Sequence, residues 1–405
     1  MKPAMSRAWT ALVVRRRRLL LVGLLVCALP AIGLLVVLAL WTLPIFGGHA
    51  LLIPHLNATR GLTYFHDAVP EVPWSMHVVK INRSRKDLEL HSMIGNGNTL
   101  AMATVSDQVK KLPPEWGRPL AAVNGDLYNN HPDYPGDPEG LQIMHGELVS
   151  GPSTNRVCFW LDAAGNPHRG DVRSRFKVTW PDGSAAPLGL NEARADHAVV
   201  LYTAVAGATT RARGGLELVL EREGSGAWLP LQIGQTYVAQ VRGVNPAGNT
   251  ALTRGTMVLS LGPALVPRVP KVGTGAVLRI TTATVPELTG VQTAIGGGPT
   301  LVEDGKTRDW PGLRLRHPRT AVGWNKDYFF LVEVDGRQLR LSAGMTLPEL
   351  ADYMVKLGCQ EAMNLDGGGS ATCWLYGHVM NSPSQGRERP APNGLVVLQT
   401  SAKKK

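Results

Sequence analysis

The stretch NLDGGGSATCWLYG, residues 364–377, places a carboxylate beside three consecutive glycines. Adjacent glycines reach positive φ angles and expose their N–H groups together, which suits a phosphate or the close approach of a sugar. A tight hairpin or bulge is the purely structural alternative. The spacing lacks the Gly-x-Gly-x-x-Gly pattern of a loop that opens a helix, so it does not predict a dinucleotide-binding site.

A second triple glycine occurs in AIGGGPTLVEDG, residues 294–305, again between two apolar runs. A second turn would explain it structurally. Glycine loses more conformational freedom on folding than other turn residues, so two such breaks favour a backbone that something must approach closely.

Charged residues near these glycines could supply the remaining chemistry. Arg319 stands at the start of an apolar run, where a planar guanidinium suits two-point binding of a carboxylate or phosphate. Asp366 and Glu388 are the best candidates for a pair of catalytic carboxylates. The alternatives are a solvated charge run at residues 314–319 and a salt bridge between Glu388 and its arginine neighbours.

An acidic loop follows the apolar run PLAAVNG. Its oxygen-bearing side chains are Asn124, Asp126, Asp133, Asp137 and Glu139. Oxygen ligands suit Ca²⁺, but the spacing fits no EF-hand. We therefore assign no metal site and no cofactor, and treat the loop as a candidate for substrate binding.

The elements that must position these residues are mainly strands. Alternating apolar residues predict strands in WSMHVVKIN, DLELHSMIG, DYFFLVEVDG, RQLRLSAG and EAMNL, and many short ones between residues 158 and 280. TVSDQVKKL predicts a short helix. TLPELADYMVKLG predicts a clearer one, because Thr346 and Glu349 form a capping box and Gly358 suits the end. The fold class predicted is α+β, strand-dominated, with a few covering helices.

The N-terminus predicts a membrane anchor. Residues 19–44 are apolar and uncharged, long enough to span a bilayer, and follow four arginines at 15–18. A cleaved signal peptide is the alternative, although its apolar core is usually shorter, about 7–15 residues. The arginines favour a cytoplasmic segment 1–18 and a single-pass inner-membrane protein whose main domain lies on the extracytoplasmic side. A linker is expected over 45–73, the domain over 74–399 and a basic tail over 400–405.

The net charge of +11 does not predict nucleic-acid binding. Six positive charges lie within residues 1–18 and three within 403–405, leaving about +2 for the rest of the chain. Cys158, Cys359 and Cys373 show no metal-binding spacing. A Cys359–Cys373 disulfide and buried, inert thiols are both compatible with the sequence, and we favour the thiols.

Several of these motifs occur in the same order in a known family. The segments AAVNGDLY, GGGPTLVEDG, RHPRTAVGW, GMTLPELADYMVKLGCQEAMNLDGGGSAT and NSPSQGRERPAPNGL resemble those of the phosphodiester glycosidase family. The resemblance covers about residues 74–399 and is strongest over 295–395. It implies a hydrolase that breaks the bond between an anomeric carbon and a phosphodiester, and the bacterial relatives imply an envelope or exopolysaccharide substrate.

The resemblance implies roles for the residues in these motifs. Asp366, Glu388 and Arg319 are the predicted catalytic residues. The predicted substrate-binding residues are Asn124, Gly125, Asp126, Gly297, Gly298, Thr320, Asn364, Gly367, Gly368, Gly369, Ser370, Asn381 and Arg389.

Two other functions remain open at this point. One is a non-catalytic protein that binds envelope polysaccharide, since NGDL at residues 124–127 departs from the family's Asn-Gly-Gly-aromatic pattern. The other is a metal-dependent phosphodiesterase, which the missing His/Asp metal-binding pattern disfavours.

Overall fold

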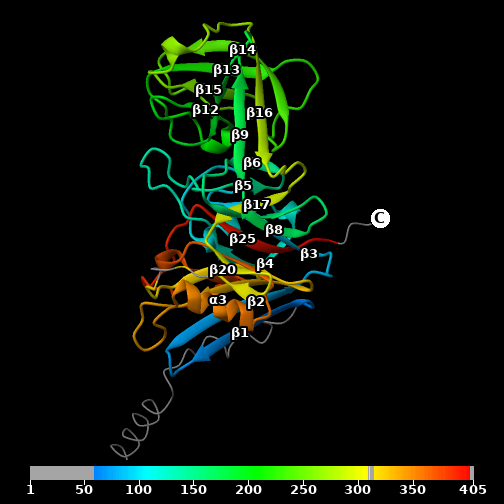
Figure 1. The fold of residues 1–405 in the computed structure, drawn as a ribbon, viewed down its shortest axis with the longest axis vertical. Coiled ribbons are helices and arrows are strands. Elements are labelled where there is room, and N and C mark those ends of the chain that lie inside the picture. The colour runs from blue at the N-terminus through cyan, green and yellow to red at the C-terminus, as the bar shows by residue number, and fades with distance from the viewer. Residues whose placement is uncertain (1–58, 309, 311–313, 402–405) are drawn as a thin grey trace, which may run out of the picture. The chain divides into compact units, whose positions relative to one another are not determined.

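The computed structural model describes residues 59–308, 310 and 314–401. The predicted cytoplasmic segment and membrane anchor lie outside the described residues. Within the described part of the chain, no helix has the length and apolar character needed to cross a membrane. The described structure is built mainly of strands in four sheets, with short helices, so the strand-dominated α+β class is confirmed (Figure 1).

A seven-stranded sheet carries much of the chemistry-bearing sequence. Its strands, in spatial order, are β1 (Leu62–Val69), β2 (Trp74–Asn82), β21 (Tyr328–Val334), β20 (Arg319–Trp324), β22 (Glu361–Asn364), β18 (Thr300–Glu303) and β19 (Lys306–Thr307). Strand β1 lies in the segment that the sequence analysis assigns to a linker. That assignment is wrong for residues 62–69, because all eight pair with β2.

A five-stranded sheet faces it across an apolar core. Its order is β24 (His378–Val379), β23 (Cys373–Leu375), β4 (Arg118–Asn124), β25 (Asn393–Gln399) and β3 (Leu88–Ile94). The shared core includes Val123, Val322, Leu331 and Leu395, drawn from both sheets. This packing brings the end of β4 beside the ends of β20 and β22.

Two further sheets complete the described structure. One has the order β6 (Glu147–Ser150), β5 (Gln142–Met144), β17 (Thr293–Gly297), β7 (Val157–Leu161) and β8 (Pro167–Asp171). The other has the order β10 (Ala185–Pro187), β9 (Arg173–Thr179), β16 (Val277–Val285), β14 (Thr236–Asn245), β13 (Leu216–Arg222), β15 (Met257–Leu261), β12 (Val199–Tyr202) and β11 (Gly189–Leu190). Both surround one apolar core, and the eight-stranded sheet is the green and yellow group in Figure 1.

The two predicted helices are confirmed as α2 (Val105–Lys110) and α3 (Leu347–Lys356). In α3 the Thr346 and Glu349 side chains cap each other's backbone N–H groups, as their spacing predicts. The helix buries Leu350, Ala351 and Met354 against the seven-stranded sheet. It thereby covers the sheet face at β18 and β22.

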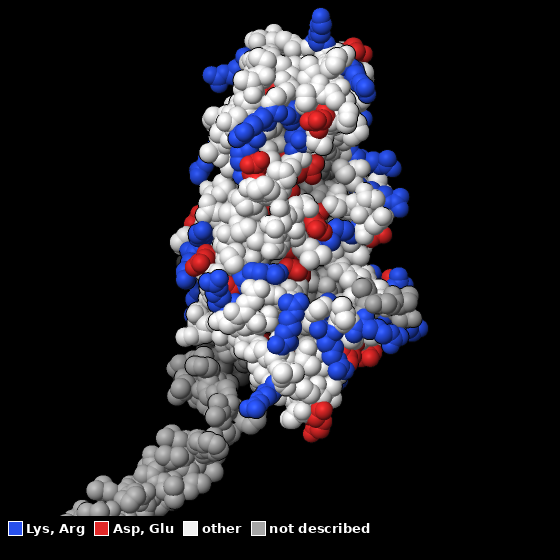
Figure 2. Space-filling view, turned by 90° about the vertical axis from the view of Figure 1, so that its left-hand side faces the viewer, with Lys and Arg blue, Asp and Glu red and all other residues white. Residues whose placement is uncertain are grey.

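The predicted strand RQLRLSAG, residues 337–344, is wrong. These residues form a tight loop closed by a bridge between Gln338 and Ser342, and Arg337 has a φ of 61°. The three described cysteines are buried and unpaired, as favoured from sequence. On the surface shown in Figure 2, basic and acidic side chains are interspersed.

Candidate active site

The glycine loop begins where β22 ends and lies between two neighbouring segments. Leu365 N donates to Thr320 O at 2.8 Å, and Asp366 N donates to Gly125 O at 2.8 Å. These bonds tie the loop to β20 on one side and to the end of β4 on the other.

The surroundings of the first two glycines, Gly367 and Gly368, show why a side chain would not fit in this loop. A Cβ on Gly367 would lie 2.5 Å from Pro318 O, so the chain before β20 occupies the space that a side chain needs. Gly368 has a φ of +60°, and a Cβ there would lie 3.2 Å from an Arg337 nitrogen. Glycine is therefore required by close backbone packing at one position and by conformation at the next.

The Asp366 carboxyl group forms the only ion pair of this loop in the described structure. Its Oδ1 accepts from Gly367 N at 2.8 Å, and its Oδ2 lies 3.4 Å from Arg389 Nη2. Burial raises the pKa of Asp366 above its usual 3.8, while Ser370 and Arg389 oppose the rise. Arg389 also donates to Ser370 Oγ through Nε at 3.1 Å, which fixes its guanidinium beside the loop.

Arg337 is a second cation at the loop, and it is not among the residues predicted from the sequence. Its Nη2 lies 3.2 Å from His317 Nδ1, and its side chain is exposed. Burial and the charges of Arg319 and Arg337 lower the pKa of His317, which favours the neutral imidazole. A signal existed in the sequence: DGRQ directly follows a predicted buried strand, at the sheet edge where β20 begins.

Arg319 lies close to Arg337 but is held by carbonyl groups. Its Nε donates to Met345 O at 2.9 Å and its Nη2 to Leu315 O at 3.0 Å. Burial, with the charge of Arg337, lowers its pKa. In the described residues no carboxylate pairs with either arginine, so both charges remain available to an anion.

Asn124 supports the loop from below. It is fully buried, its Nδ2 donates to Asp366 O at 2.7 Å, and its Oδ1 accepts from Thr320 Oγ1 at 2.7 Å. Thr372 N donates to the same Oδ1 at 3.0 Å. Asn124 and Thr320, which the sequence predicts as substrate-binding residues, thus position the backbone of the loop.

Glu388 lies next to Arg389 in the chain but is directed elsewhere. Its Oε1 accepts from Ser106 N at 3.1 Å, at the start of α2. Arg389, in contrast, contacts Asp366 and Ser370. The structure therefore does not join Glu388 and Asp366 by any hydrogen bond or shared partner among the described residues.

The remaining predicted residues make contacts within the protein. Asn381 is buried and bonded to Glu333, Ala371 and Cys373. Asn364 Nδ2 donates to Gly298 O at 3.0 Å, while Asn364 Oδ1 has no hydrogen-bond partner.

The second glycine stretch and the acidic loop lie beside one another. A Cβ on Gly296 would lie 2.2 Å from Asp126 Oδ2, and one on Gly297 would lie 2.8 Å from Asn364 O. Asp126 forms an ion pair with Arg156, which also pairs with Glu139 at 2.8 Å. Burial raises the pKa of Asp126 to about 6 against the effect of Arg156. The second triple glycine therefore accommodates buried protein groups.

A separate cavity lies away from the glycine loop. Its volume is about 770 Å³, and its lining includes His91, His145 and residues 326–329. Those last residues lie at the end of β20 and β21 opposite Arg319, so the cavity does not include Asp366. The chemistry-bearing residues mark the candidate site more specifically than cavity size does.

Comparison with known proteins agrees with the motifs. Residues 231–398 match the model of a family described as phosphodiester glycosidase. The chain is 43% identical over 67 residues to N-acetylglucosamine-1-phosphodiester alpha-N-acetylglucosaminidase of Bos taurus, covering 16% of this chain and 12% of that protein. It is 35% identical over 114 residues to SPbeta prophage-derived uncharacterized protein YomE of Bacillus subtilis, covering 27% of this chain and 18% of that protein.

The chain thus spans less than a fifth of the length of either curated relative. A crystal structure of a hypothetical protein from Synechocystis shares the fold, with a TM-score of 0.66 and 20% identity, covering 84% of this chain and 62% of that one. The matched region contains the Asp366 loop, Arg319, Arg337 and Arg389. By these matches and motifs, residues 231–398 of the chain resemble the phosphodiester glycosidase family.

Proposed function

We propose that the protein hydrolyses the bond between the anomeric carbon of a sugar and a phosphodiester. The observation that carries this proposal is the position of the Asp366 carboxyl group in a loop flanked by Arg337 and Arg389. One site thereby offers a carboxylate for an anomeric carbon and cations for a phosphate.

The arginines and the loop backbone would bind the phosphate. Arg319 and Arg337 carry charges that no described carboxylate neutralises, and Arg389 is fixed by Ser370. As the glycosidic bond breaks, negative charge grows on the leaving phosphate, and fixed cations stabilise it without reorganisation. Arg337 is the most exposed of the three arginines, and we assign to it the first contact with the phosphate.

Asp366 would act at the anomeric carbon, where positive charge develops in the transition state. A phosphomonoester leaves without full protonation, so a second carboxylate acting as a general acid is not needed. This agrees with the contact of Glu388 to α2 rather than to the loop. The proposal therefore assigns catalysis to Asp366 and gives Glu388 no chemical step.

The proposal also includes the cellular location of the protein. The apolar segment 19–44 would anchor the chain in the inner membrane, with residues 59–401 on the extracytoplasmic side. The substrate would then be a glycan phosphodiester of the envelope or an exopolysaccharide. Fractionation of cells followed by protease treatment of intact spheroplasts tests it: the domain should be digested, and protection would contradict this orientation.

Product analysis tests the reaction. The full chain is incubated with UDP-N-acetylglucosamine, and the products are identified by mass spectrometry. Cleavage at the anomeric carbon gives free sugar and UDP, whereas cleavage of the P–O–P linkage gives sugar 1-phosphate and UMP. The second pair would identify a phosphodiesterase. Saturable binding of sugar phosphodiesters without any product would identify a binding protein.

A further inference from the structure

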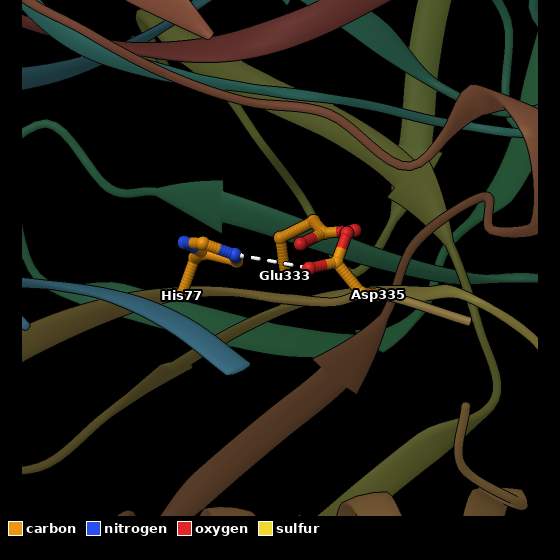
Figure 3. A group of neighbouring side chains, drawn as sticks. All are labelled: His77, Glu333 and Asp335. Carbon is orange, nitrogen blue, oxygen red and sulfur yellow. Dashed lines mark hydrogen bonds and ion pairs between the residues drawn. The ribbon is translucent and has the colours of Figure 1, made fainter. Parts of the chain in front are cut away.

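A second group of acidic side chains lies inside the protein, apart from the Asp366 loop. His77 on β2 pairs directly with Glu333 on β21, and Asp335 lies two residues further along the same face. Figure 3 shows the three side chains directed toward one another. One donor atom from each lies within 4.8 Å of the others, and the residues are 5%, 0% and 1% exposed.

This group has no arginine or lysine beside its two acids in the described residues. In the described residues, its sole ion pair is the 3.1 Å contact of His77 Nε2 with Asp335 Oδ2, and no arginine or lysine pairs with either acid. Glu333 Oε2 is buried without a hydrogen-bond partner. A buried carboxylate without compensation is costly, so two acids side by side need either a bound cation or a retained proton.

The surrounding hydrogen bonds hold the donor atoms as a metal site requires. Tyr64 Oη lies 2.8 Å from His77 Nδ1, and when Nδ1 carries the proton, the Nε2 lone pair faces Asp335. The lone pairs of His77 Nε2 and Asp335 Oδ2 then face each other. This arrangement is favourable when a cation lies between the two atoms. Outer hydrogen bonds of this kind orient metal-binding histidines and carboxylates.

The carboxylates are oriented in the same way. Asp335 Oδ2 accepts from Ser75 Oγ at 2.8 Å and Oδ1 from Ser382 N at 2.7 Å. Glu333 Oε1 accepts from Asn381 Nδ2 at 3.1 Å, which leaves Oε2 directed into the group. Glu333 therefore keeps Oε2 free for a ligand, and Asp335 Oδ2, which accepts one hydrogen bond from Ser75, keeps a lone pair beside His77 Nε2.

We propose that His77, Glu333 and Asp335 bind one divalent cation of the Zn²⁺ or Mn²⁺ type. An imidazole nitrogen with two carboxylates suits these ions better than Mg²⁺ or Ca²⁺, which prefer oxygen ligands throughout. Because the group is buried, the ion has a structural role and contacts no substrate. It joins β2 to β21 and, through Asn381 and Ser382, to the segment that follows the glycine loop.

Metal content of the wild-type chain tests the proposal without any substitution. The tag-free full chain is treated with EDTA, dialysed against Zn²⁺ or Mn²⁺ and then against metal-free buffer. We expect about one equivalent of at least one of these ions by mass spectrometry, and a higher unfolding temperature than for the EDTA-treated chain. A chain that retains neither ion and unfolds at one temperature throughout would overturn the site and indicate a proton shared by the two acids.

Two substitutions locate the ion. Glu333→Gln and Asp335→Asn should each weaken metal binding at least about tenfold. Glu217→Gln is the matched control, since Glu217 is also fully buried but has Ser260 and Thr250 as hydrogen-bond donors. Equal metal loss in the control and in the Glu333 variant would place the ion elsewhere. If the cluster variants do not fold, the wild-type measurement still decides.

Discussion

Two groups of carboxylates at one end of the seven-stranded sheet differ in what neutralises them. Asp366 follows β22 and faces Arg389, with Arg337 above the same loop. Glu333 and Asp335 lie at the end of β21 with His77 and without arginine or lysine among the described residues. The first group has an excess of positive charge and suits an anion, whereas the second has an excess of negative charge and suits a cation.

The two groups are also connected. Asn381 bonds to Glu333 from one side and to Ala371 and Cys373, just beyond the glycine loop, from the other. Thr320, which supports Asn124, pairs across the sheet with Glu333. The His77 group is therefore linked through buried hydrogen bonds to the loop that carries Asp366.

The largest effect should come from removing the reacting carboxylate. Asp366→Asn keeps the shape and the contact with Gly367 N but cannot offer negative charge at the anomeric carbon. We expect the rate of sugar release to fall about 10³-fold, as for loss of a preorganised charge that stabilises the transition state. Asp352→Asn, on the exposed face of α3, serves as control for activity and unfolding temperature. Full activity in the Asp366 variant would remove it from the reaction.

The next effect concerns the exposed cation. Arg337→Gln removes a charge that no described carboxylate balances, so folding should be little affected. Because the charge would stabilise the leaving phosphate, we expect kcat/KM to fall about 10²-fold, as for loss of one preorganised donor. Arg340→Gln, an exposed arginine of the same loop, should stay at the wild-type value. Equal losses in the two variants would point to a general effect of loop charge.

The connection between the groups should matter for stability. Asn381→Ala leaves Glu333 Oε1, Ala371 O and Cys373 N without their buried partner. We expect a loss of about 1–3 kcal/mol in the free energy of unfolding, measured by urea denaturation. Asn98→Ala, at an exposed position, is the control. An unchanged stability would show that the two groups are energetically independent.

Local sequence signals predicted much of the fold. The capping box of Thr346 and Glu349 and the alternation in WSMHVVKIN depend on neighbours in the chain, and both elements formed at the expected positions. Residues 337–344 also alternate, but the bridge of Gln338 to Ser342 and the positive φ values of Arg337 and Gly344 make them a loop. Alternation alone could not show that the chain reverses there.

The site was predictable in part. The glycines mark the loop, because their requirement for a close or left-handed backbone is visible in the sequence. The contact partner of Glu388 was not predictable, because Glu388 and Arg389 are adjacent in the sequence yet contact different elements. The His77 group was not predictable either, because His77 and Glu333 become neighbours only through the register of β2 with β21.

The smallest effect that we expect is a shift in the pH dependence of sugar release, caused by the charges around Asp366. Burial raises its pKa and Arg389 lowers it, so the carboxylate form, and with it sugar release, should be lost on acidification at a pH above 3.8. Arg389→Gln removes the lowering influence and should move the acid limb of the normalised pH–rate profile to higher pH. Arg387→Gln, the exposed neighbour, should leave the limb in place.

A shift to lower pH in the Arg389 variant would contradict the pairing of Asp366 with this arginine. No shift at all would assign the acid limb to another group, and Asp366 would then contribute in a form that does not titrate in that range.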